Sequence, residues 1–193
     1  PIIVPVLAQA GLKVFKMSGR GLSHTGGTID KLEAIPGFRT SLSLDEIKDS
    51  LKECGAVIVA QTADLAPADK ALYALRDVTA TVDSLPLIAS SIMSKKLASG
   101  SDVILLDVKY GSGAFMKNKE EALELAKRMV SIGAKAKKRC AAIVSSMEQP
   151  LSDAVGCNLE MRSALSVLHG RKKGSLYEVA KEICARIFTL AGT

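Results

Sequence analysis

The hydrophobic pattern divides the chain into short strands and longer helices. Runs rich in β-branched and aliphatic residues predict strands at 13–17, 56–61, 103–108 and 141–145, and the runs at 56–61 and 103–108 have the pattern of buried parallel strands. Helical spacing, together with start and stop signals, predicts a helical turn at 28–35 and helices at 4–11, 44–54, 67–78, 85–97, 119–132, 159–168 and 176–191. Thr28 is the expected cap of the turn at 28–35, and Ser43 is the expected N-cap of the helix at 44–54.

Strands that alternate with helices predict an α/β fold, with a mostly parallel sheet flanked by helices. The stretch 67–99 breaks this rhythm, because it contains two consecutive helices with no strand between them. We therefore expect a helical excursion that belongs to a smaller, all-α lobe. The expected domain organisation is a first α/β part at 1–66, a helical segment at 67–99, and a continued, incomplete α/β part at 100–193.

Composition places the chain among ordinary soluble globular proteins, with 48% apolar and 24% charged residues. The net charge of +6 suits anionic ligands. Two basic clusters, at 135–139 and 171–173, lack the aromatic residues that stack bases, so we predict solvated surface and no nucleic-acid partner. No apolar run reaches the roughly 20 residues of a membrane span. The four cysteines lack metal-ligand spacing, which predicts reduced, mostly buried thiols in a cytoplasmic protein.

The glycine-rich segment 16–33 has the chemistry of a phosphate cradle. Glycines between a strand and a helix let backbone N–H groups approach an anion closely. The hydroxyls of Ser18, Thr25 and Thr28 add neutral donors, Lys16 and Arg20 add positive charge, and the start of the following helix adds its dipole. The alternative is a tight loop whose glycines only satisfy a positive φ.

Two further segments carry candidate chemistry. Ser91 and Lys95 are four residues apart on an expected helix, so they share a face, and with Arg76 they suit a polar planar ring. The alternative is a set of solvent-facing charges. The segment 107–115 follows a buried strand, where ligands gather in open α/β sheets, although a well-packed turn explains it equally well.

Three long strings resemble the thymidine/pyrimidine-nucleoside phosphorylase family: SGRGLSHTGGTIDKLEAIPGF at 18–38, QTADLAPADKALYALRDVTATVDSLPLIASSIMSKK at 61–96 and LDVKYGSGAFMK at 106–117. The resemblance implies an enzyme that cleaves a pyrimidine nucleoside with inorganic phosphate, giving the free base and a pentose 1-phosphate. It also implies a small helical domain, a large α/β domain with the active site in the cleft between them, and a homodimer formed through the helical domain.

The resemblance assigns roles residue by residue. It implies a phosphate site formed by Lys16, Met17, Ser18 and Thr28, with Ser18 and Thr28 as direct ligands. It implies that Arg76, Ser91 and Lys95 hold the pyrimidine ring, with Arg76 and Lys95 acting in catalysis on the departing base. Phosphate is a substrate, and no cofactor is implied. His24 does not match the family's histidine near the base, so we expect a structural role for it.

The chain departs from the family's pattern in two places. The family's Lys-His-Ser-Thr-Gly-Gly segment, with further phosphate ligands, lies upstream of the first residue of this chain, so we expect this chain alone to be inactive or nearly so. Some relatives hold a structural potassium ion partly through backbone carbonyls at positions that match Leu151 and Ala154, but Ser163 stands at the acidic ligand's position. We therefore expect no metal in this chain.

Two alternatives to the phosphorylase stay open. One is a phosphoribosyltransferase of the same architecture, which needs an acidic Mg²⁺ site; no Asp/Glu pair is placed for one near the glycine loops. The other is a non-catalytic module that folds or dimerises.

Overall fold

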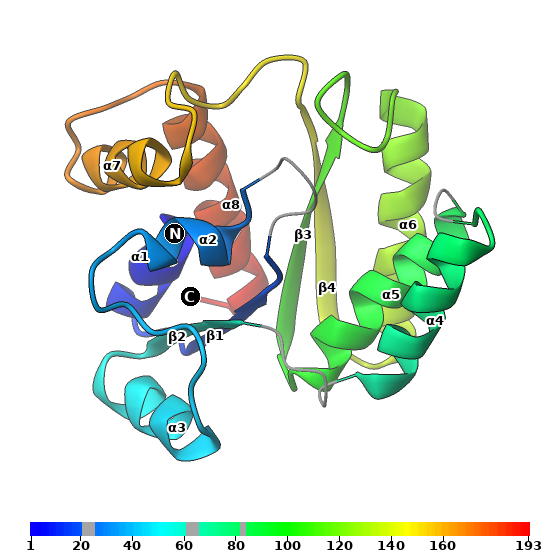
Figure 1. Ribbon diagram of the computed structural model, residues 1–193, viewed down its shortest axis with the longest axis horizontal. Helices are drawn as coiled ribbons and strands as arrows, with labels where there is room; N and C mark the ends of the chain where they lie inside the picture. The colour runs from blue at the N-terminus through cyan, green and yellow to red at the C-terminus, as the bar shows by residue number, and fades with distance from the viewer. Residues whose placement is uncertain (21–25, 61–65, 82–83) are drawn as a thin grey trace. The chain divides into compact units, whose positions relative to one another are not determined.

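The computed structural model describes residues 1–20, 26–60, 66–81 and 84–193, so His24 lies outside the described residues. The elements follow one another in this order: α1 (Ile3–Gln9), β1 (Val14–Ser18), α2 (Thr28–Glu33), α3 (Leu44–Glu53), β2 (Ala56–Ala60), α4 (Pro67–Val78), α5 (Leu85–Ala98), β3 (Val103–Tyr110), α6 (Lys119–Lys135), β4 (Arg139–Ser146), α7 (Cys157–Leu168) and α8 (Ser175–Ala191) (Figure 1).

The chain forms two compact units. The first unit comprises Pro1–Gln61 and Leu151–Cys184, and the second comprises Thr62–Pro150 and Ala185–Thr193. Each contains one pair of parallel strands, β1 with β2 and β3 with β4. The predicted α/β class and the parallel strands are therefore confirmed, and among the described residues the strands form two separate pairs. The three-part domain division expected from the sequence stays a prediction.

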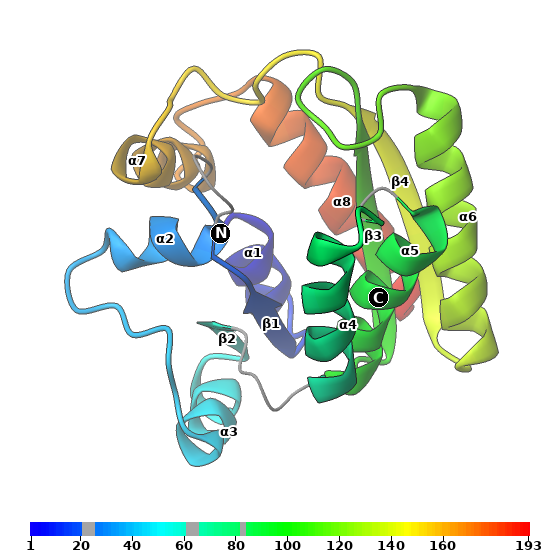
Figure 2. The same ribbon diagram turned by 45° about the vertical axis from the view of Figure 1, so that its right-hand side comes forward.

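The second unit is built around β3, whose alternating residues Ile104, Leu106 and Val108 are buried. They share one core with Ala89 and Met93 of α5 and with the apolar face of α6. Figures 1 and 2 show α6 running alongside the β3–β4 pair, with α5 beside α6. Because both long helices direct aliphatic side chains to this core, the scarcity of aromatic residues does not prevent tight packing.

The first unit has a smaller core. Ile2, Ala164, Val167 and Ala180 pack together, and α2 contacts α7. An ion pair of 2.5 Å between the Lys31 Nζ and a Glu160 carboxylate oxygen joins these two helices. Among the described residues, no helix is long and apolar enough to cross a membrane.

The helix ends test the capping predictions. Ser43 begins α3 as predicted: its Oγ accepts from the Glu46 N–H at 3.3 Å, and the Glu46 carboxylate accepts from the Ser43 N–H at 2.8 Å. The predicted Thr28 cap is wrong, because Gly27 is the N-cap of α2 and Thr28 is its first helical residue. The Asp30 carboxylate accepts from the Gly27 N–H at 2.8 Å, which is the contact that the third helical residue makes to the N-cap in a capping box.

The cysteine prediction is half right. All four are free thiols, but only Cys184 is buried, whereas Cys140 and Cys157 are half-buried and Cys54 is exposed. Burial raises the pKa of the Cys140 and Cys184 thiols, which keeps both in the protonated form at neutral pH.

Gly133 of α6 marks the closest approach of that helix to β4. A Cβ at this position would lie 2.6 Å from the Cys140 Cβ and 2.7 Å from its Sγ. Alanine is the better helix former, but this contact forces the strand or the helix to move. We predict that Gly133→Ala lowers the free energy of unfolding by about 1–3 kcal/mol, measured by urea denaturation. Ser131→Ala, at an exposed position of the same helix, is the control and should change it by less than about 0.5 kcal/mol. An unchanged or raised stability for Gly133→Ala would contradict this packing.

Candidate active site

The predicted phosphate residues lie at the end of β1 and at the start of α2. Lys16, Met17 and Ser18 are the last three residues of β1, which pairs with β2 as far as Ser18 and Ala60. Ser18 and Thr28 are both partly exposed. The helix α2 has only six residues, so its dipole adds less than the sequence argument expected.

Lys16 is the cation of this segment that belongs to the predicted set. Partial loss of hydration around its ammonium lowers the pKa of Lys16. The residue as a whole remains exposed. A lysine ammonium can donate charge-assisted hydrogen bonds to phosphate oxygens, so Lys16 has suitable chemistry for this ligand.

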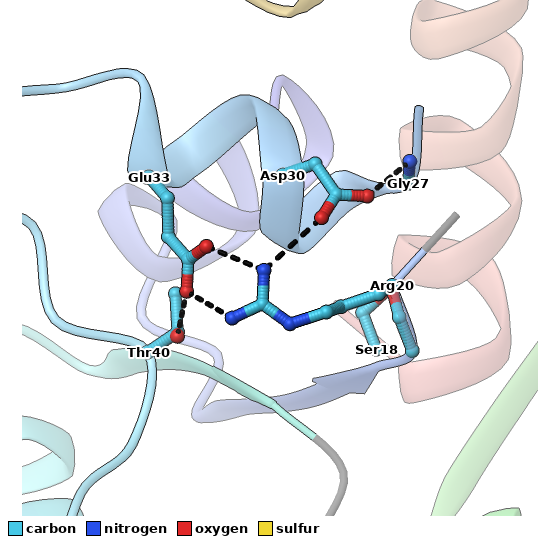
Figure 3. A network of polar contacts seen from close by, with 7 residues as sticks. Ser18, Arg20, Gly27, Asp30, Glu33 and Thr40 are labelled. Carbon is cyan, nitrogen blue, oxygen red and sulfur yellow. Dashed lines mark hydrogen bonds and ion pairs between the residues drawn. The ribbon is translucent and has the colours of Figure 1, made fainter. Parts of the chain in front are cut away.

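Arg20 does not behave as the sequence argument expected. Its guanidinium forms a forked contact with Glu33, with nitrogen–oxygen distances of 2.6 and 2.7 Å, and reaches the Asp30 Oδ1 at 3.1 Å (Figure 3). Thr40 donates its hydroxyl to Glu33 at 2.6 Å. The charge of Arg20 is therefore engaged by two carboxylates of α2 and does not stand ready for phosphate.

This network joins the residue Arg20, just after β1, to the start of α2. Arg20 precedes residues 21–25 in the chain and Gly27 follows them, and Asp30 contacts both, taking a guanidinium N–H on one oxygen and the Gly27 N–H on the other (Figure 3). The hydrogen bonds of Arg20 and Thr40 lower the pKa of the Glu33 carboxyl. Ser18 and Thr28 are close in sequence to Arg20 and Gly27, but their hydroxyls take no part in these contacts, and the Ser18 hydroxyl donates to the Gly19 carbonyl oxygen at 3.4 Å.

The predicted base-binding residues lie on α4 and α5. The Lys95 Nζ donates to the Ser91 Oγ at 3.0 Å, which confirms that these two residues share a face of α5. Ser91 is buried, and Arg76 is buried on α4, with only 6% of its surface exposed. The alternative of a solvent-facing charge therefore does not apply to Arg76.

Asp69 belongs to this cluster and was missed by the sequence argument. Its Oδ2 lies 2.9 Å from the Lys95 Nζ, and the residue is only 8% exposed. Asp69 and Arg76 are seven residues apart, which places them on one face of α4. That spacing of an acid and a base on a helix is the signal that could have identified Asp69.

A buried carboxylate and a buried guanidinium are costly to withdraw from water unless they are paired or hydrogen-bonded. Here Asp69 holds the Lys95 ammonium in one position, and Ser91 supports it from the same helix. The arrangement presents a cation whose place is fixed before any ligand arrives, which is the property that electrostatic catalysis requires.

The third predicted segment, 107–115, is a packed turn. Gly111 has a φ of +116°, and a Cβ there would lie 2.6 Å from the Glu148 carboxylate. A Cβ on Gly113 would lie 2.8 Å from the Met147 carbonyl oxygen. The alternative explanation of these glycines, a close approach of two segments, therefore accounts for them.

At the expected potassium position, the described side chains contact one another and a lysine. Ser163 is buried, and its Oγ lies 2.7 Å from the Ser152 Oγ. The Lys172 ammonium contacts both the Ser163 Oγ, at 3.4 Å, and the Asp153 carboxylate. The carboxylate of Asp153, which lies between Leu151 and Ala154 in the sequence, is thus engaged by a cation of the chain itself. Within the described ranges, no group of three His, Cys, Asp or Glu residues could hold a metal ion.

Comparison with known proteins gives consistent matches. A family model described as "Glycosyl transferase family, a/b domain" matches residues 2–192. The pyrimidine-nucleoside phosphorylases of Bacillus subtilis (strain 168) and Geobacillus stearothermophilus are each 50% identical to this chain over 190 residues. The protein of the same name from Staphylococcus aureus (strain USA300) is also 50% identical. Each alignment covers 98% of this chain and 44% of the relative, so the chain spans less than half the length of these relatives.

The Arg20 network predicts a pair of reciprocal pKa changes. Arg20→Gln should raise the pKa of Glu33 toward its ordinary value, because its largest stabilising partner is removed. The pKa of Glu46, lowered to about 2 first by the Ser43 backbone and then by Arg39, should not change. Arg39→Gln, the control, should raise the pKa of Glu46 and leave the pKa of Glu33 unchanged. Carboxyl titration by NMR measures both, and a Glu33 pKa unaffected by Arg20→Gln would contradict the network.

The sign of the stability effect follows from the same shift. Because the folded-state pKa of Glu33 is lowered, the network stabilises the fold above the unfolded carboxyl's pKa, and this stabilisation is lost as the pH falls through the folded-state pKa. The difference in stability between the native chain and Arg20→Gln should therefore be present at neutral pH and vanish in acid.

Proposed function

The chain belongs to the glycosyl transferase family whose a/b domain the family model describes, and on this premise we propose that the complete protein is a pyrimidine-nucleoside phosphorylase. It transfers the pentose of uridine or thymidine from the base to inorganic phosphate. The observation that carries the proposal is the fixed ammonium of Lys95, held by buried Asp69 and by Ser91.

The base is the group that Lys95 serves. When the C–N glycosidic bond breaks, its electron pair goes to the pyrimidine, and negative charge spreads to the ring's carbonyl oxygens. An ammonium and a guanidinium at those oxygens stabilise the departing base more than the neutral substrate, so they lower the barrier. We assign this role to Lys95 and Arg76, and a hydrogen bond to the ring to Ser91.

Phosphate is the nucleophile. One of its oxygens forms the new bond to the anomeric carbon as the base departs, and the product is a pentose 1-phosphate. We assign Ser18 and Thr28 as direct ligands of phosphate, with Lys16 and Met17 lining the site. The partial exposure of Ser18, at the end of β1, and of Thr28, at the start of α2, supports this assignment.

The reaction needs no oxidant, reductant or cofactor, since phosphate is consumed as a substrate. We propose that the complete protein acts in the cytoplasm as a homodimer formed through the helical segment. The exposed row Leu72, Leu75 and Val78 on α4, of which Val78 is 79% exposed, supports an interface there.

We predict that Lys95→Met in the complete protein lowers kcat/KM for uridine about 10²–10³-fold, because a charge that acts in the transition state is lost. Since this change leaves Asp69 buried without the cation, Lys95→Met/Asp69→Asn should recover thermal stability without recovering activity. Lys96→Met, one position along α5, is the control and should keep activity within a few-fold. Near-normal turnover by Lys95→Met would remove Lys95 from the mechanism.

A second prediction separates the two substrates. Ser18→Ala should raise the KM for phosphate about tenfold, the effect of losing roughly 1.4 kcal/mol of hydrogen bonding, while the KM for uridine stays nearly constant. Ser41→Ala, at an exposed position outside the segment 16–33, serves as control. Initial rates at varied phosphate and varied uridine distinguish the two constants. An equal rise in both would argue against Ser18 as a phosphate ligand.

A further inference from the structure

A cation that is part of the chain lies against the segment 151–156. Lys172 was expected to be solvated surface, but its ammonium contacts the Asp153 Oδ1 and lies 3.4 Å from the Ser163 Oγ. Its side chain is 35% exposed, whereas the neighbours Arg171 and Lys173 are exposed. One member of the basic cluster is therefore directed inward.

The contacts continue from the ammonium into the backbone. The Ser163 Oγ, buried on α7, lies 2.7 Å from the Ser152 Oγ, which in turn accepts the Ala154 N–H at 3.3 Å. Lys172 thus ties the connection after α7 to α7 itself and to the segment before it. The segment joins β4 to α7 and has no regular structure of its own. These side-chain contacts therefore hold it in place.

The chemistry of this donor set is that of a monovalent-cation site. It offers one carboxylate and hydroxyl oxygens, and the residue at the position expected to be acidic is the neutral Ser163. One carboxylate balances one positive charge, and Lys172 supplies that charge as a compact ammonium with three donors. A second cation placed beside it would be repelled by the ammonium and would lack a carboxylate of its own.

We propose that the Lys172 ammonium serves as the built-in cation of the segment 151–156 and takes the place that a potassium ion would occupy. The segment then stays ordered without any bound metal. The stability of the protein, and its activity, become independent of which monovalent cation is in solution.

The test compares Lys172→Met with Lys173→Met, a matched control one residue away, in the complete protein. Melting temperatures are measured in potassium, sodium and choline chloride at equal ionic strength. The native protein should melt at the same temperature in all three. Lys172→Met should melt about 2–4 °C lower in choline and recover part of that loss in potassium, whereas Lys173→Met should match the native protein. Lys172→Arg should retain most of the stability.

Hydrogen exchange supplies a local readout. Amides of 151–156 should exchange faster in Lys172→Met than in the native protein or in Lys173→Met, and added potassium should slow them. A potassium-specific rise in the native melting temperature would overturn the proposal. So would unchanged exchange at 151–156 in Lys172→Met, or a Lys172→Met protein that responds to potassium no more than to choline.

Discussion

The ion pair between Lys95 and Asp69 is the interaction on which the candidate site depends. Without a partner, an ammonium beside a buried helix interface would lose hydration with no compensating interaction. A buried carboxylate without a partner would lose even more hydration. At a separation of 2.9 Å, the attraction between the two charges compensates each of them for its lost hydration. The pair also fixes a direction, because the cation stays where the carboxylate on α4 and the hydroxyl on α5 hold it.

The same arrangement recurs where the chain places other cations. Arg20 is held by Asp30 and Glu33, and Lys172 is held by Asp153. In each case a carboxylate determines where the positive group lies, and the positive group joins segments that are distant in sequence or irregular. The chain's excess of basic residues is therefore only partly a general attraction for anions. Arg20, Lys95 and Lys172 are each held in place by a carboxylate of the chain.

The sequence predicted the elements well because hydrophobic spacing and helix signals are local. Residues 67–78 and the Ser43 cap were identified correctly from such signals. The pairing of charges was not predictable in this way, because Asp69 meets Lys95 only after two helices pack. The role of Arg20 was missed for the same reason, since its partners lie ten and thirteen residues away on a helix whose orientation the sequence does not specify. Likewise, the sequence could not show why Gly111 and Gly113 are glycines, because residues 147–148 approach them only in the folded chain.

The most direct test of the proposed phosphorolysis is to measure the consumption of phosphate and the release of the base in the same reaction. The complete protein is incubated with uridine and inorganic phosphate, ³¹P NMR follows the phosphate, and chromatography follows the base. The account predicts that free uracil and a pentose 1-phosphate appear in equal amounts, and that neither appears when phosphate is omitted. Release of uracil without consumption of phosphate, or no release at all, would contradict it.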